Sequence, residues 1–173
     1  DPVVMAAQII SALQTIVSRN VHPLDAAVIS VTQVHGGDSW NVIPDSVVLR
    51  GTARSFKPDV QDSIEPAIQR IISGVTTAYG GSCELRYERR YPATINHEQP
   101  TQLALAAARA VAGENQVDSN PTPSMGSEDF AFMLQARPGA YIFIGNAPAK
   151  GQKPIEGAGL HGMHCMLHNP HYD

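Results

Sequence analysis

The stretch "VISVTQVHGGDSWNVIPDSVVLRGTARS", residues 28–55, decides the fold of this chain. Residues 28–34 are rich in β-branched side chains, and residues 47–55 alternate well enough to form a second strand. Glycine, aspartate, serine and proline fill the segment between them, as they do in loops. The stretch therefore predicts two antiparallel strands joined by a long loop.

Helices are predicted on both sides of this strand pair. Asp1 can cap a first helix and Pro2 suits its first turn, and apolar residues recur at helical spacing to about Asn20. A second apolar face extends over residues 57–79, where Pro66 should kink the helix or shift its start.

Gly80-Gly81 should end the second helix, and Cys83–Tyr91 resembles a third strand. The resulting order is α-β-β-α-β. One strand before the first helix would complete the split, ferredoxin-like β-α-β-β-α-β order. The sequence therefore predicts an α+β fold and indicates a fragment of a longer polypeptide.

The second half predicts a mixed arrangement. Residues 103–111 form an Ala-rich helix ended by Gly113, and Ser127 is a plausible N-cap of a short helix that continues through 130–134. "AYIFI", residues 140–144, is a continuous apolar run typical of a buried strand.

Composition excludes several classes of partner. The chain has 173 residues, a net charge of −4 and no long basic run, which argues against nucleic acid. No membrane-spanning apolar run and no signal-peptide pattern are evident, so we expect no membrane partner. Cys83 and Cys165 are expected to be reduced, which favours a cytoplasmic location, although one disulfide is possible.

Four histidines and one cysteine crowd the tail with the spacing H-x2-H-C-x2-H-x2-H, residues 161–171. Histidine and cysteine are zinc ligands, but no C-x2-C pair accompanies them. The spacing alone leaves two interpretations open, a metal site and a solvated loop.

Three further stretches carry side chains suited to catalysis or binding. His35, at a strand end before Gly36-Gly37, could stabilise an oxyanion, and Asn41 lies in the same loop. Arg54 could bind a carboxylate or simply face solvent. The adjacent acids of "SMGSEDF", Glu128 and Asp129, could support a metal site or act as a general base, or only favour a helix start.

Taken together, these stretches resemble the M20 metallopeptidase family. The closest branch is that of amidohydrolases acting on N-acyl amino acids, such as hippurate and indole-acetyl-amino-acid hydrolases. The resemblance covers nearly the whole chain in the same order, through "QVHGGDSWNVIPDSVVLRGTARSF", "YPATIN", "PSMGSEDFAFML", "PGAYIFIGN" and "LHNPHYD".

The resemblance implies a domain division and a cofactor. Residues 1–91 would be the ferredoxin-like lid and dimerisation domain without its first strand, and residues 92–173 the C-terminal part of an α/β metallohydrolase catalytic domain. The family binds two divalent metal ions per active site, usually zinc, manganese or a similar ion. We therefore expect a homodimeric hydrolase acting on small N-acyl amino acids.

The resemblance also implies roles for individual residues. His168 matches a metal ligand, and His35 matches a lid histidine that steadies the oxyanion in a neighbouring subunit's active site. Asn41 matches a lid asparagine near that site, and Arg54 is a substrate-carboxylate contact or a lid-structure residue. The pocket candidates are Gly126, Ser127, Glu128 and Asp129.

The family's N-terminal motifs do not occur in this sequence. They are a Cys-His metal motif, paired glutamates with the general base, and a histidine before the lid. We therefore expect the chain alone to be inactive. Two alternatives stay open, a non-catalytic dimerisation module and a small zinc-binding tail domain.

Overall fold

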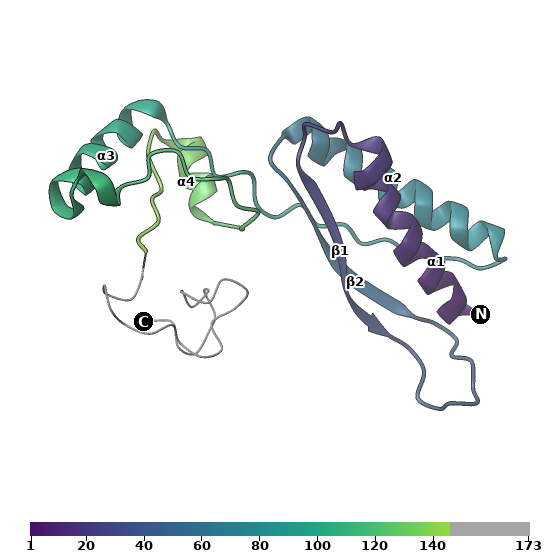
Figure 1. The fold of residues 1–173 in the computed structure, drawn as a ribbon. Helices are drawn as coiled ribbons and strands as arrows, with labels where there is room; N and C mark the ends of the chain where they lie inside the picture. Colours follow the sequence, from purple (N-terminus) through teal and green to yellow (C-terminus); the bar gives the residue numbers. More distant parts are fainter. Residues whose placement is uncertain (146–173) are drawn as a thin grey trace.

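The computed structural model describes residues 1–145, which gather into two groups of elements (Figure 1). The predictions for the tail concern residues outside this range, namely His161, His164, Cys165, His168 and His171. The first group holds α1 (Pro2–Thr15), the π-helix η1 (Ile16–Asn20), β1 (Ala27–His35), β2 (Val48–Ser55) and α2 (Pro58–Ala78). The second holds α3 (Glu98–Ala112), the 3-10 helix η2 (Glu114–Gln116) and α4 (Phe130–Ala136).

The strand pair forms as predicted. β1 and β2 are antiparallel, with Ala27 opposite Ser55 at one end and His35 opposite Val48 at the other. The ladder has one irregularity, because Val31 pairs with Gly51 while the next pair is Gln33 with Arg50. Thr32 is therefore the extra residue of a β-bulge.

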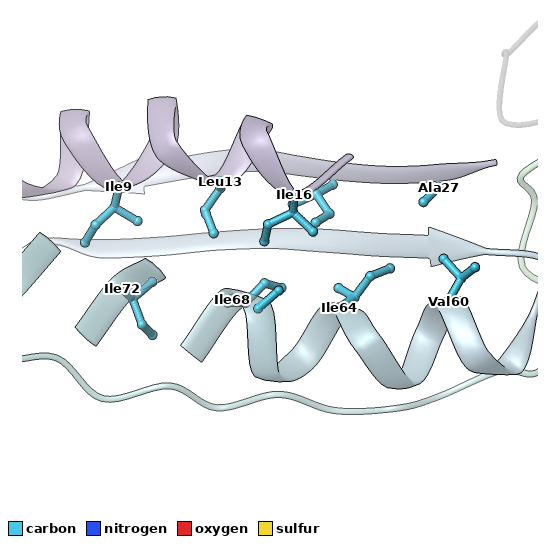
Figure 2. Close-up of a cluster of buried hydrophobic side chains, with 10 residues drawn as sticks. Ile9, Leu13, Ile16, Ala27, Val60, Ile64, Ile68 and Ile72 are labelled. Atoms are coloured by element: carbon cyan, nitrogen blue, oxygen red, sulfur yellow. The ribbon is translucent and has the colours of Figure 1, made fainter. Parts of the chain in front are cut away.

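Both long helices pack on the same face of this pair. The buried side chains of α1 and α2 converge on the strands (Figure 2), and Ala27 and Ile29 of β1 complete the cluster. Leu49 and Ala53 of β2 pack against it partly buried. Cross-strand partners share a face, so the opposite face, here called the outer face, carries Val28, Ser30, Gln33, His35, Val48, Arg50, Thr52 and Arg54.

Gly51 is expected to be required by the bulge. A Cβ at this position would overlap the carbonyl oxygen of Ser30 and lie 3.2 Å from Val31 Cα. We expect Gly51→Ala to lower the free energy of unfolding by about 1–3 kcal/mol, because backbone must move to admit the methyl group. Urea unfolding measures this change.

Gly74→Ala is the matched control. A Cβ on Gly74, inside α2, would meet no atom within 4 Å. Alanine is the better helix former, so this variant should gain up to about 1 kcal/mol. If Gly51→Ala were as stable as the parent protein, the claim that the bulge requires glycine at this position would be wrong.

The first helix begins as predicted but has more membrane-like character than expected. The carboxylate of Asp1 accepts hydrogen bonds from the amides of Val3 (2.9 Å) and Val4 (3.4 Å). By length and composition, Pro2–Asn20 is apolar enough to cross a membrane, contrary to the sequence-based expectation of no such run. Its buried residues Ile9, Leu13 and Ile16 pack in the core, which gives this apolar face a partner within the fold.

The second and third helices end as predicted, and the predicted cap of the short helix α4 is wrong. Gly80 has a positive φ of 69° two residues after the end of α2, and Gly113 has one of 90° directly after α3. Pro66 lies within α2 and does not interrupt it. Ser127 does not cap α4; the amide of Phe130 donates to the Glu128 carboxylate instead, at 3.2 Å.

Neither Cys83–Tyr91 nor Ala140–Ile144 forms a strand, so both predictions are wrong. Leu85 and Tyr87 still alternate toward the core, partly buried against it. A strand needs a neighbouring backbone for its N–H and C=O groups. Within residues 1–145, the ladder of β1 and β2 is the whole of the sheet.

Candidate functional site

His35 ends β1 on the outer face, and its side chain is exposed. Its Nε2 atom lies 3.4 Å from Oε1 of Gln33, two residues earlier on the same face. The chain turns away directly afterwards, with Gly37 at a φ of +79°. A Cβ on Gly36 would lie 2.7 Å from Val47 Cγ2. The imidazole therefore lies exposed at the end of the strand pair, on its outer face.

Asn41 lies in the loop that follows His35. The loop and the start of α1 line an open hollow of about 620 Å³, and Asn41 and Trp40 are part of this lining. Trp40 is fully exposed, at 106% of its reference surface. The structure thus places Asn41 beside an open, partly apolar surface at the same end of the strand pair as His35.

Arg54 links the strand pair to the predicted pocket segment. It lies near the end of β2, and its guanidinium donates to the carbonyl oxygen of Met125 and to Ser127 Oγ, the latter at 3.4 Å. Of the predicted site residues, Arg54 and Ser127 are therefore brought together. Gly126 lies between the two contacted residues.

His35 and Arg54 stand at opposite ends of the same face. His35 is opposite Val48, and Arg54 is six positions further along β2. At about 3.4 Å per residue, this separation is roughly 20 Å. The structure therefore does not bring these two predicted site residues together within one chain.

Glu128 is fixed by two donors. The hydroxyl of Tyr141 donates to its carboxylate at 2.8 Å, and the amide of Phe130 donates to the other oxygen. The hydrogen bond from Tyr141, and then that from Phe130, hold the pKa of Glu128 below its ordinary value of 4.5. The same contact with Glu128, together with burial, raises the pKa of Tyr141 above 10.0.

Asn96 and Tyr141 were not singled out from the sequence. The side-chain amide of Asn96 donates to the carbonyl oxygen of Tyr141 and accepts from its amide, each at 2.8 Å. The residues lie in "YPATIN" and "AYIFI", which carried the resemblance without any assigned role. Their pairing holds Tyr141 where it reaches Glu128.

Tyr141→Phe is expected to raise the pKa of Glu128 toward its ordinary value. The pKa of the folded carboxyl is lowered, so its stabilising contribution is present above about 4.5 and lost as pH falls through the lower folded value. The variant should therefore melt below the parent protein near neutral pH, and this difference should shrink in acid. Thermal melts across the acid range, with an NMR titration of Glu128, measure both effects.

Tyr79→Phe serves as the control for that experiment, because Tyr79 is a half-exposed tyrosine in the other group of elements. Its melting curve should follow that of the parent protein at every pH. An unchanged Glu128 titration in Tyr141→Phe would contradict the contact.

The described residues do not by themselves fit a metal centre. Within residues 1–145, no group of three or more histidine, cysteine, aspartate or glutamate side chains could hold a metal ion. The predicted ligand His168 lies outside this range. No catalytic step through a metal can therefore be built on these residues.

The chain belongs to peptidase family M20/M25/M40, which matches it over residues 4–160. The predicted family is thereby confirmed.

Relatives of this family include enzymes acting on N-acyl compounds. The chain is 39% identical to the N-acetyl-L-cysteine deacetylase of Bacillus subtilis strain 168 over 84% of its length, and 32% identical to the hippurate hydrolase of Campylobacter jejuni, also over 84%. It spans only 34% and 38% of the lengths of those two proteins.

Solved structures of the family have a similar fold. A protein described as an aminohydrolase from methicillin-resistant Staphylococcus aureus matches the whole chain with a TM-score of 0.74 and 29% identity, over 41% of its own length. The Bacillus subtilis YXEP protein, described as a dinuclear metal-binding peptidase of the M20 family, matches 81% of the chain with a TM-score of 0.62 and 33% identity, over 35% of its own. Family membership and the second description support the use of divalent metal ions.

Proposed function

We propose that this chain is part of an enzyme that uses divalent metal ions to hydrolyse the amide bond of N-acyl amino acids, such as hippurate-like substrates. The observation that carries the proposal is the family match over residues 4–160. The deacetylase and hippurate hydrolase among its relatives support the substrate class. The complete enzyme, meaning this chain with the rest of the family's length, would be a cytoplasmic protein with zinc or manganese.

We assign residues 1–91 to a ferredoxin-like lid and dimerisation domain, and residues 92–173 to the C-terminal part of the catalytic domain. The two groups of elements in Figure 1 support this division. The unpaired segment 83–91 supports the ferredoxin-like order. In that order the last strand pairs with a strand that precedes the first helix, and segment 83–91 occupies the place of this last strand. Leu85 and Tyr87 already face the core as residues of that strand would.

We propose that His35 acts in the active site of the second subunit of a homodimer. The separation of roughly 20 Å between His35 and Arg54 supports this, because a small N-acyl amino acid is much shorter than that distance. His35 and Asn41 would then serve one site, and Arg54 with the "MGSEDF" segment another. Exposure of His35, Trp40 and Asn41 leaves their surface open for a second subunit.

The chemistry assigned to this chain is electrostatic and positional. When bound, the metal ions would supply and polarise the attacking water. The imidazole of His35 would donate a hydrogen bond to the oxyanion that forms at the amide carbonyl. The guanidinium of Arg54 donates hydrogen bonds to Met125 and Ser127. A guanidinium group can also bind a carboxylate through two parallel hydrogen bonds, so Arg54 would hold a substrate carboxylate beside the candidate pocket residues Gly126–Asp129.

The proposal is tested by measuring amide hydrolysis of benzoyl-, acetyl- and indole-acetyl-amino acids by the complete enzyme. Metal-dependent release of the free amino acid from at least one of these substrates is expected. Release from none of them by a metal-loaded dimer would favour the alternative of a non-catalytic dimerisation module. Sedimentation of the 173-residue chain should show a dimer. An activity assay of the same chain should show no hydrolysis, because the chain spans well under half the length of its relatives.

A further inference from the structure

Side chains alternate regularly between the two faces along β2, but along β1 this alternation is interrupted at one residue. In β2, Arg50, Thr52 and Arg54 fall on the outer face at every second position. In β1, Ala27, Ile29 and Val31 face the core. A regular β1 would continue that series and point Gln33 and His35 toward the core as well. The observed partners of Gln33 and His35 are Arg50 and Val48, which places both on the outer face.

The bulge resolves this mismatch. Val31 and Thr32 together occupy the place of one residue opposite Gly51, so the side chains that follow change face. Gly51 is suited to this place, since a Cβ would overlap the Ser30 carbonyl oxygen. The polar residues Gln33 and His35 consequently avoid the helix-covered face, where an unpaired polar group costs free energy.

We propose that the β-bulge at Thr32 is a positioning device that sets which face of the lid His35 occupies. It puts the imidazole on the face from which Arg54 contacts Met125 and Ser127. The catalytic part of this inference rests on the proposed function of His35. The structural part concerns only the face on which the His35 side chain lies, and it does not depend on that function.

Two variants remove the bulge, and they differ in the face that His35 and its neighbours in the ladder occupy. Deleting Thr32 leaves His35 opposite Val48 in a regular ladder and keeps it on the outer face. Inserting one threonine between Arg50 and Gly51 gives Thr32 a partner and turns Arg50, Val48 and His35 toward the helices. The pairing of His35 with Val48 is the same in both.

The experiment combines NMR of the 173-residue chain with kinetics of the complete enzyme. Side chains of Arg50 and Thr52 should show mutual NOEs in the parent protein and in the deletion, and none in the insertion. The insertion should lower kcat roughly hundred- to thousandfold with little change in KM, as loss of one oxyanion donor does, whereas the deletion should cost less than about tenfold.

Each measurement can overturn the proposal. Cross-strand NOEs that place Thr32, rather than Gln33, opposite Arg50 in the parent protein would remove the bulge itself, and no variant needs to fold for that test. Full kcat in an insertion variant whose NOEs show the changed face would refute the positioning role. If His35→Ala keeps full activity, the proposed function of His35 fails while the NOEs still decide the bulge.

Discussion

Replacing His35 with alanine in the complete enzyme is expected to lower kcat roughly hundred- to thousandfold, the usual effect of losing one oxyanion donor. KM should change little, because the proposed hydrogen bond forms mainly as charge develops on the carbonyl oxygen. His35 is exposed at the end of β1 and is not part of the buried core, so the variant should fold. Steady-state kinetics and a thermal melt separate the two effects.

His22→Ala is the matched control, because His22 is another exposed histidine in the same group of elements. Its kcat should equal that of the parent enzyme. A His35→Ala enzyme with unchanged kcat would refute the oxyanion role. If His35 acts in the active site of the second subunit, activity should return when His35→Ala subunits are mixed with subunits that keep His35 but carry another inactivating substitution. One of the two active sites in each mixed dimer should then work.

Replacing His168 with alanine is expected to remove metal from the complete enzyme and abolish most of its hydrolysis. The prediction rests on the match of "LHNP" to a metal ligand of the family, since His168 lies outside the described residues. A lost ligand typically lowers metal affinity steeply, so the metal bound per subunit should fall. Metal analysis after dialysis gives a measurement independent of activity.

His171→Ala controls for general effects on the tail, because His171 lies three residues away in the same "LHNPHYD" stretch. Its metal content should match that of the parent enzyme. Full metal stoichiometry in His168→Ala would remove this residue from the set of ligands. Equal metal loss in both variants would support a self-contained zinc site in the tail.

The sequence predicted elements whose signals are local. The boundaries of β1 and β2 agree with the predictions to within one residue at each end, because β-branched runs and a glycine-rich loop mark them. Apolar spacing also predicted α2, and Gly80 and Gly113 end their helices as expected. The cap at Asp1 is of the same kind, since its partners lie within three residues.

Features that depend on distant partners were not predictable. Cys83–Tyr91 has the composition of a strand, yet no described segment pairs with it. The contact of Arg54 with Met125 and Ser127 joins residues far apart in the chain, so the sequence could suggest a substrate carboxylate, solvent or a structural role in the lid but not these partners. Both Ser127 and Glu128 lie close enough to the start of α4 to accept a hydrogen bond from its first amides. Their spacing from the helix alone could not show that Glu128 is the acceptor.

The two-stranded sheet has a consequence for handling the chain by itself. β2 pairs with β1 along one side, and among residues 1–145 no strand pairs with its other side. Such an edge exposes N–H and C=O groups that can recruit a strand from another molecule, which is a common origin of aggregation. Arg50 and Arg54 place positive charge along this strand and oppose stacking of identical edges. Solubility of the isolated chain should therefore fall as ionic strength rises, because salt screens the repulsion between these charged strands.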